Sequence, residues 1–370
     1  MNGQYGDSTR SVTASTTHGV AGAPLAPPPV PASAYHLSPD ETAPQDVYGR
    51  SSNPTWRQLE SALAGLEGAT AALSFSSGMA AITAVLRVLA TPGTRLLVPA
   101  DGYHQVRAYA MEVLAPQGVQ VSTASAERMC DAAEHADVVL AETPVNPTLD
   151  VVDLHRLALA CRSRGATLVV DNTTPTPFGQ QPLSLGADLV VASATKALAG
   201  HGDVLAGYVA GCRDDLLAAV ERERLLSGAI LGTFEAWLVL RSLGSAGLRF
   251  ERQCHNALAV AMMLRGHDAV RAVRYPGLPD DPAHAVAAGQ MRRFGGLVSA
   301  ELADAAAVHD LAQRSALLVS ATSFGGIHSS VDRRARWGDP VSDGFARFSL
   351  GIEDTDDLVA DIHHALSELM

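Results

Sequence analysis

The chain has 370 residues, of which 47% are hydrophobic and 18% charged, a composition typical of a globular protein long enough for two or three packed units. Its formal net charge of −12 disfavours nucleic acid as a partner, because an acidic surface repels the phosphate backbone. No apolar run reaches the roughly 18 residues of a membrane-spanning helix, and the first residues lack the layout of a signal peptide, so we expect a cytoplasmic protein with no membrane partner.

The N-terminal stretch, residues 1–45, is rich in Ala, Pro, Ser and Thr. Its segment 22–37 reads GAPLAPPPVPASAYHL, and proline both removes backbone donors and biases its neighbours toward extended conformations. The sequence therefore predicts that residues 22–37 do not form a helix and that residues 1–50 form an extended arm, ordered or partly ordered. A flexible tail is the alternative that this composition leaves open.

The first clear helix signal follows the arm. Asn53 is suited to cap a helix, and Pro54 is suited to its first position. Gly68 is typical of a helix end. Between them, apolar residues fall on one stripe, namely Trp56, Leu59, Leu63 and Leu66. We expect a helix between Asn53 and Gly68, and a second helix over residues 78–90.

Short apolar runs separated by helical stretches continue the chain. The runs occupy residues 95–100, 137–143, 167–173, 188–195 and 206–211. Their alternation with segments such as 154–165 predicts an α/β fold whose mostly parallel sheet is covered on both faces. In such sheets the chemistry collects at the carboxyl ends of the strands, where Glu142, Asp171 and Lys196 fall.

The second half of the chain begins with a long helical region over residues 214–267. Strand-like segments follow at 295–303 and 345–353. A closing helix at 354–370 has one apolar face, made of Leu358, Ile362 and Leu366. We therefore divide the chain into the arm at 1–50, a large domain at 51–240 and a smaller C-terminal α+β domain at 241–370.

Two residues at strand ends are candidates for chemistry. Lys196 follows Ser193 and Thr195 after an apolar run. Burial would lower the pKa of this lysine and make its amine a nucleophile and a base; a solvated lysine is the ordinary alternative. Asp171 ends another buried run, where a carboxylate needs a cation such as a protonated pyridine nitrogen. A helix-capping aspartate would give the same pattern.

Binding groups for an anion and a carboxylate are also present. The stretch SSGMAA (76–81) leads into a helix whose N–H groups and dipole favour an anion, and the hydroxyls of Ser193 and Thr195 are suited to the same role. Arg347 on a late apolar strand suits bidentate binding of a carboxylate, unless it is a surface arginine. The four cysteines form no CxxC pair and no GxGxxG follows a strand, so we expect no metal site, no disulfide framework and no nicotinamide cofactor.

Seven sequence blocks, in the same order, resemble the Cys/Met-metabolism family of enzymes that depend on pyridoxal 5′-phosphate (PLP). The blocks are YGRSSNPTWRQLE, FSSGMAAI, ETPVNPTLDVVDL, VVDNTTPTPFGQQPLSLGADLVVASATKALAGHGD, RYPGLPDDP, TSFGGIHS and RFSLGIED. The resemblance covers residue 17 to the end and is strongest to actinobacterial cystathionine gamma-lyases. It implies an aminotransferase-like fold of type I, PLP as the cofactor, an amino-acid substrate, and a homotetramer of dimers that share active sites.

The resemblance also implies roles for single residues. Lys196 would bind the cofactor covalently and act as the base, and Tyr103 would stack on the ring as a second catalytic group. Asp171 would hold the ring nitrogen, and Arg347 would bind the substrate α-carboxylate with Asn146 and Ser323 close by. The other cofactor contacts would come from Ser77, Gly78, Met79, Ser193 and Thr195, from Asn146 at the ring oxygen, and from Tyr48 and Arg50 of a neighbouring subunit.

Four positions depart from the common pattern of that family. His104 stands where the family often has glycine, and Ala197 where an aromatic residue often follows the lysine. His328 replaces a common glutamate, and Ser51 a second arginine. We expect these positions to lie around the distal end of the substrate, so they leave the cofactor chemistry intact and the substrate open.

The resemblance implies γ-elimination of L-cystathionine to L-cysteine, 2-oxobutanoate and ammonia, by a carbon–sulfur lyase of trans-sulfuration in cysteine and methionine metabolism. The alternatives are γ-replacement by a cystathionine gamma-synthase or O-acylhomoserine sulfhydrylase, γ-cleavage of methionine, and β-cleavage of cystathionine. Ser51 argues against γ-replacement. A non-catalytic binding protein is a further alternative, which the intact set of Lys196, Asp171 and Arg347 disfavours.

Overall fold

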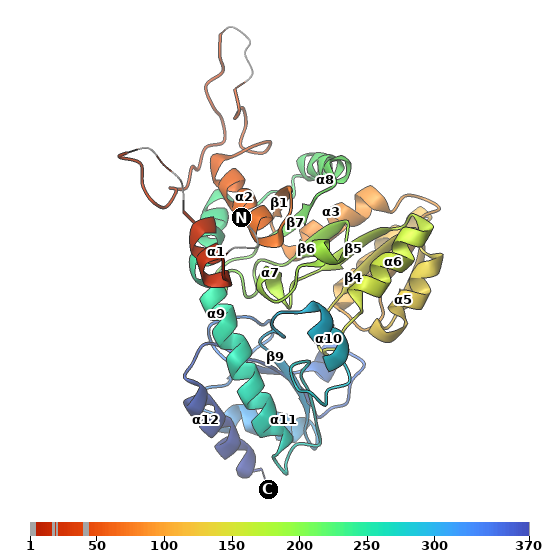
Figure 1. The fold of residues 1–370 in the computed structure, drawn as a ribbon, viewed down its shortest axis with the longest axis vertical. Coiled ribbons are helices and arrows are strands. Elements are labelled where there is room, and N and C mark those ends of the chain that lie inside the picture. The colour runs from red at the N-terminus through yellow and green to blue at the C-terminus, as the bar shows by residue number, and fades with distance from the viewer. Residues whose placement is uncertain (1–4, 17–18, 20, 40–43, 370) are drawn as a thin grey trace.

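The computed structural model describes residues 5–16, 19, 21–39 and 44–369 of the chain. Within these residues the strands form two sheets, one of seven strands and one of five. Figure 1 shows the larger sheet in the upper half of the molecule and the smaller sheet below it, with the long helix α9 (Thr233–Arg265) running alongside both. The predicted α/β fold with a mostly parallel sheet is confirmed.

The larger sheet has the strand order β1-β7-β6-β5-β4-β2-β3. All neighbours from β6 to β3 are parallel, and β7 runs antiparallel to both of its neighbours. Five of these strands lie in the predicted apolar runs, whereas β1 and β3 were not predicted. The strands are β1 (Ala71–Phe75), β2 (Arg95–Pro99), β3 (Gln120–Ala124), β4 (Val138–Glu142), β5 (Thr167–Asp171), β6 (Leu189–Ala192) and β7 (Gly207–Gly211).

Helices cover both faces of this sheet, as its buried and predominantly apolar central strands require. Leu189 and Val191 of β6 pack with α3 and α8, while Val190 and Ala192 point the other way and pack with α2 and α9. This alternation is the two-residue period of a strand. The helices of this half are α2 (Pro54–Glu67), α3 (Gly78–Leu89), α4 (His104–Tyr109), α5 (Met129–Ala132), α6 (Leu154–Arg164), α7 (Thr176–Gly179) and α8 (Asp214–Ser227).

The predicted limits of α2 are confirmed by its end contacts. The Asn53 side chain accepts a hydrogen bond from Thr55 N at 2.8 Å, and Pro54 is the first helical residue. Gly68 ends the helix with φ +73°, a left-handed conformation that glycine adopts without a Cβ penalty.

The smaller sheet has the order β10-β11-β12-β9-β8 and is mostly antiparallel. Its elements are β8 (Ala272–Arg274), α10 (His284–Gln290), β9 (Leu297–Glu301), α11 (Ala305–Arg314), β10 (Val319–Ser320), β11 (Ser330–Arg333), β12 (Phe345–Ser349) and α12 (Thr355–Ser367). The predicted apolar face of α12 is buried in the core of this sheet. Met370, the last residue of that predicted helix, lies outside the described residues.

The region predicted to be helical, 214–267, is helical apart from one break, because α8 ends at Ser227 and Gly228 adopts φ +70° before α9 begins at Thr233. The prediction of an extended N-terminal arm was wrong in one part. The arm contains a helix, α1 (Asp7–Ala14), whereas residues 21–39 are non-helical as predicted. The parts of the predicted arm at 1–4, 17–18, 20 and 40–43 lie outside the described residues.

The packing of α1 explains why it is helical despite a polar sequence. Gly247 N on α9 donates to Ser11 Oγ at 2.8 Å, and the Arg10 guanidinium donates to the Leu66 carbonyl. A Cβ at Gly247 would lie 2.8 Å from Ser11 Oγ, so glycine permits this close approach. Tertiary contacts therefore determine this helix.

None of the helices in the described part of the chain combines the length and the apolar character that crossing a bilayer would require.

Candidate active site

The carboxyl ends of β4, β5 and β6 meet at one edge of the larger sheet. Glu142 at the end of β4 is the direct register partner of Asp171 at the end of β5, and Asp171 pairs with Val191 of β6. Lys196 lies in the loop that follows β6. The strand-end argument from the sequence therefore located these three side chains correctly, and their proximity sets the charges of the site.

Lys196 is held in a largely buried position above this edge. Its Nζ donates to Ser323 Oγ at 2.8 Å and lies 5.1 Å from the centre of the Phe324 ring. Burial, followed by the positive charges of Arg347 and Arg334, lowers the pKa of Lys196 to about 8. About a tenth of this amine is therefore uncharged at pH 7, far more than for a lysine with the ordinary pKa of about 10.4, and the uncharged form is the one that acts as a nucleophile or a base.

Asp171 is a buried carboxylate with hydrogen bonds to only one of its two oxygens among the described residues. Thr173 donates to its Oδ1 through both its backbone N, at 3.0 Å, and its Oγ1, at 2.5 Å. Burial raises the pKa of Asp171, and in the described part of the chain no arginine, lysine or histidine forms an ion pair with it. A cationic ring nitrogen would supply the missing partner.

The N-terminus of α3 forms the anion-binding end of the site. Ser77 caps the helix through a hydrogen bond from Ala80 N to its Oγ, at 3.0 Å. Gly78 packs against Ser193 so closely that a Cβ would lie 2.8 Å from Ser193 Cβ. The N–H groups of Gly78 and Met79, in the first turn of the helix, have no intrahelical acceptor, and the Ser193 side chain is beside them.

Thr195 is less available than the sequence predicted. Its Oγ1 donates to the Ala206 carbonyl at 3.2 Å and accepts from Ala206 N at 2.9 Å. This pair of contacts joins the loop before Lys196 to the start of β7. Thr195 therefore braces the lysine loop, and its hydroxyl would reach a phosphate only after giving up the bond that it donates.

Glu142 organises the opposite wall of the site. Its Oε2 accepts from Tyr103 N at 2.7 Å, and its Oε1 accepts from Asn146 N at 2.9 Å. Burial and the neighbouring Asp171 raise the pKa of Glu142 to about 8. Tyr103 is 40% exposed, and its ring meets the His104 ring edge-on at 5.2 Å. One of the four departures, His104, therefore borders Tyr103, and another, Ala197, directly follows Lys196.

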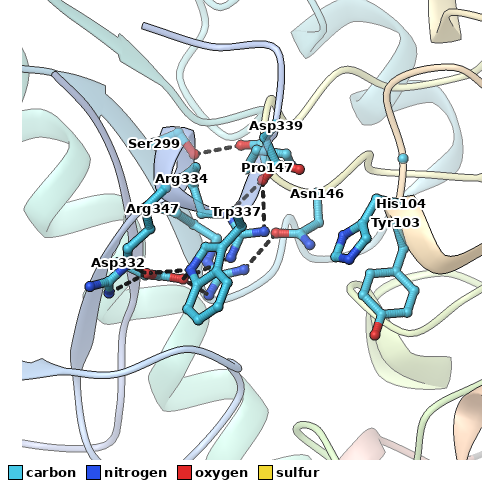
Figure 2. A network of polar contacts seen from close by, with 12 residues as sticks. Tyr103, His104, Asn146, Pro147, Ser299, Asp332, Arg334, Trp337, Asp339 and Arg347 are labelled. Atoms are coloured by element: carbon cyan, nitrogen blue, oxygen red, sulfur yellow. Dashed lines mark hydrogen bonds and ion pairs between the residues drawn. The ribbon is translucent and has the colours of Figure 1, made fainter. Parts of the chain in front are cut away.

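Arg347 on β12 connects the smaller sheet to this wall. Its Nη1 donates to Asn146 Oδ1 at 2.8 Å, and its Nη2 donates to the Ser323 carbonyl at 2.6 Å. Figure 2 shows Arg347 beside Asn146, with Tyr103 and His104 beyond them. Burial, followed by the charge of Arg334, lowers the pKa of Arg347 to about 10. The structure thus brings Arg347, Asn146, Ser323 and Lys196 together.

Tyr48 and Arg50 are placed elsewhere. The Arg50 guanidinium lies 5.6 Å from the centre of the Tyr48 ring and donates to the Leu225 carbonyl at 3.2 Å. Both residues are exposed. Within the described residues of this chain, neither of them contacts Lys196 or Asp171.

Sequence reasoning did not find Thr173, Phe324, Asp332 or Arg334. Thr173 lies two residues after Asp171, the last residue of β5, so the stretch DNTT carried a local signal for it. Asp332 and Arg334 carry no motif, and only the pairing of β11 with β12 places them beside Arg347.

These features fit PLP, the cofactor that the resemblance implies. The site offers a buried carboxylate that lacks a cation, an amine with a lowered pKa, and a helix N-terminus closed against Ser193 by a glycine. In PLP, the ring nitrogen is complementary to the carboxylate, the aldehyde to the amine, and the phosphate to the helix N-terminus.

Comparisons with known proteins agree with this geometry. Residues 8–367 match the family described as "Cys/Met metabolism PLP-dependent enzyme". A Streptomyces coelicolor protein named "Putative cystathionine gamma-lyase" is 48% identical over 370 residues, which cover 98% of this chain and 94% of that protein.

Two solved structures have the same fold. Apo CalE6, a methionine gamma lyase from Micromonospora echinospora, is 38% identical with a TM-score of 0.92 and covers 99% of this chain and 100% of its own. Cystathionine gamma synthase from Xanthomonas oryzae pv. oryzae, in complex with cystathionine, is 34% identical with a TM-score of 0.93 and covers 98% of both chains. The relatives therefore carry the names of different reactions within one family.

Proposed function

Since the chain belongs to the Cys/Met metabolism family of PLP-dependent enzymes, we propose that it cleaves L-cystathionine by γ-elimination, giving L-cysteine, 2-oxobutanoate and ammonia. The observation that carries the proposal is that Ser323 contacts both Lys196 and Arg347. Lys196 Nζ donates to Ser323 Oγ at 2.8 Å, and Arg347 donates to the Ser323 carbonyl, so the amine lies beside the arginine. The name of the Streptomyces coelicolor relative supports the choice of substrate.

The chain's own residues would hold the cofactor at three points. Lys196 would bind its aldehyde carbon, Asp171 would pair with its ring nitrogen, and the N–H groups of Gly78 and Met79 with the Ser193 hydroxyl would bind its phosphate. Tyr103 would stack on the ring and Asn146 would approach the ring oxygen. Bound PLP supplies an electron sink that stabilises negative charge on the α carbon of an amino acid.

Residues of the smaller sheet and the lysine loop would act on the substrate. Arg347 would bind the α-carboxylate with its guanidinium, which Asn146 Oδ1 and the Ser323 carbonyl orient. Lys196 Nζ would remove the proton from the α carbon and return it to the cofactor-bound substrate at another atom, which leaves the amine free to remove a proton from the β carbon. The γ carbon–sulfur bond then breaks, and Tyr103 Oη or Lys196 Nζ would protonate the departing thiolate as L-cysteine. One water is consumed overall, and the remnant leaves as 2-oxobutanoate and ammonia.

Product analysis of the PLP-loaded protein with L-cystathionine tests this reaction directly. We expect L-cysteine and 2-oxobutanoate in equal amounts by mass spectrometry. L-homocysteine with pyruvate would move the cut to the β carbon. The absence of any product, with bound cofactor still visible by its absorbance, would contradict cystathionine as the substrate.

Three alternatives share the same cofactor site. Cystathionine gamma-synthases and O-acylhomoserine sulfhydrylases add a nucleophile in place of the final hydrolysis, and methionine gamma-lyases cleave a shorter substrate. Ser51, in place of a second arginine, argues against γ-replacement. Incubation with an O-acyl-L-homoserine plus either L-cysteine or sulfide, or with L-methionine alone, separates these reactions from cystathionine cleavage by their products.

We assign Tyr48 and Arg50 to the site of a neighbouring copy, in a dimer that pairs into a homotetramer. Both side chains are exposed and away from Lys196 of their own chain, which is the arrangement that a shared site requires. The cytoplasmic location expected from the sequence stays a prediction, as does the division into an arm and two domains at residues 50 and 240.

The lowered pKa of Lys196 predicts how PLP capture depends on pH. Lys196 is the only lysine in the chain, so borohydride reduction followed by peptide mass analysis counts captured cofactor at one side chain. The amine attacks only when deprotonated, so we expect the capture rate of cofactor-free protein to rise about tenfold per pH unit and to level off above about pH 8.

A control variant checks the cause of this profile. The charge of Arg347 lowers the pKa of Lys196, so Arg347→Gln should raise that pKa and move the midpoint of the profile to higher pH. A wild-type rate that still climbs steeply above pH 9, as for an ordinary lysine with a pKa of about 10.4, would contradict the prediction.

A further inference from the structure

Asp332 is a buried carboxylate beside Arg347 to which the mechanism above gives no role. It lies on β11 directly opposite Arg347 on β12 in antiparallel register, and its side chain is 1% exposed. Figure 2 shows it at the centre of a network of polar contacts. Its oxygens accept from Arg334 Nη1 at 2.7 Å, Arg336 Nη2 at 2.7 Å and Trp337 Nε1 at 3.1 Å, and Arg347 Nη2 is 3.5 Å away.

This cluster carries an unmatched positive charge. Three arginines share two carboxylates, because Arg334 also pairs with Asp339 at 2.7 Å. Arg347 has the longest carboxylate contact of the three arginines. Burying a cation without a full counter-charge is costly, so the cluster favours one more anion.

Arg347 has a donor available for that anion. Its Nη1 and Nη2 donate to uncharged oxygens, those of Asn146 and the Ser323 carbonyl. Its Nε is buried and has no hydrogen-bond partner among the described residues. Asp332 thus holds the guanidinium in place without neutralising it.

We infer that Asp332 is a positioning residue for Arg347: it fixes the guanidinium between β11 and the Asn146 wall while leaving its charge for the α-carboxylate of the substrate. This inference rests on the proposed function, because it takes Arg347 as the carboxylate site. A purely structural Asp332 would anchor the turn of Arg334 and Trp337 and have no selective effect on carboxylates.

Two ligands that differ only in a carboxylate separate these roles. L-norleucine carries the α-amine and α-carboxylate, pentylamine lacks the carboxylate, and neither has a leaving group at its γ carbon. The Kd of each is measured on PLP-loaded protein through the visible absorbance of the cofactor. For Asp332→Asn we expect the preference for L-norleucine over pentylamine to fall about tenfold, as the loss of a charge-assisted contact implies.

Matched variants complete the experiment. Asp339 is also buried and forms an ion pair with Arg334 but none with Arg347, on which its charge acts less than that of Asp332. Asp339→Asn should therefore leave the preference within about twofold of wild type, and Asp332→Glu should restore part of it. Equal weakening of both ligands in Asp332→Asn, or an equal loss of preference in Asp339→Asn, would overturn the inference.

A milder variant guards against misfolding of Asp332→Asn. Arg336 is 39% exposed and donates twice to Asp332 Oδ1. Arg336→Gln therefore removes two hydrogen bonds that fix Asp332, by a change at a partly exposed side chain. We expect its preference to fall about threefold, and an unchanged preference would count against the inference. Neither ligand needs cystathionine cleavage, so failure of the proposed reaction leaves this test intact. If the wild-type protein binds L-norleucine no more tightly than pentylamine, Arg347 does not bind the α-carboxylate, and this inference is wrong.

Discussion

Lys196→Ala is expected to lower kcat with L-cystathionine by at least about a thousandfold, because it removes both the attachment point of the cofactor and the base. Among the residues that the structure describes, the cations whose charges act on Lys196 are the guanidiniums of Arg347 and Arg334, and an arginine cannot replace the amine as attachment point or as base. The loss should appear in kcat and not only in KM, since Arg347 would still bind the carboxylate.

A second readout of Lys196→Ala does not depend on turnover. Lys196 is the only lysine in the chain, so borohydride reduction of the loaded variant should attach no cofactor to any peptide, whereas wild type should carry it on the Lys196 peptide. Lys196→Arg is the matched control, because it keeps a positive charge beside Ser323 and Phe324 but cannot capture an aldehyde. Turnover of L-cystathionine by either variant within about tenfold of wild type would contradict the assigned chemistry.

The sequence predicted those parts of the fold that local rules determine. Asn53, Pro54 and Gly68 delimit α2 by cap chemistry, and the apolar runs locate the central strands, whose two buried faces require such runs. Strand β3 was missed because Gln120–Ala124 is an exposed edge strand with polar residues. Helix α1 was missed because its contacts with α9 and α2, rather than its own pattern, stabilise it.

The same division holds within the site. Lys196, Asp171 and Glu142 could be predicted, because parallel strands end at a common edge and each follows or ends one. Thr195 illustrates the limit of that reasoning, since only the structure shows its hydroxyl bonded to Ala206. Asp332 lies far along the chain from Lys196, and its role depends on the register of β11 with β12. No spacing in the sequence encodes that register.

Asp171→Asn is expected to separate activity from stability. Asparagine keeps the size of the side chain and the acceptor for Thr173, but it cannot carry the negative charge that holds a protonated ring nitrogen. We expect kcat to fall by about a hundredfold to a thousandfold, the usual cost of removing a preorganised charge. The visible absorbance of the bound cofactor should change as well, because the protonation state of its ring would differ.

The stability of the cofactor-free protein should change in the opposite direction. Burial raises the pKa of Asp171 in the folded state, so its charged form opposes folding, and its contribution to stability is lost as pH rises through the folded pKa. Asp171→Asn removes that cost and should raise the thermal unfolding midpoint of the cofactor-free protein at pH 7 to 8, with a smaller difference in acid. Thr173→Val is the matched control, because it keeps the charge of Asp171. It removes the 2.5 Å hydrogen bond to Asp171 Oδ1 and the 2.8 Å hydrogen bond that Thr173 Oγ1 accepts from Ser193 N, so it should lower the midpoint and reduce kcat less. A cofactor-free Asp171→Asn protein that is less stable than wild type at neutral pH would show that the Asp171 carboxylate stabilises the fold. The argument that Asp171 is present in order to pair with the ring nitrogen would then fail.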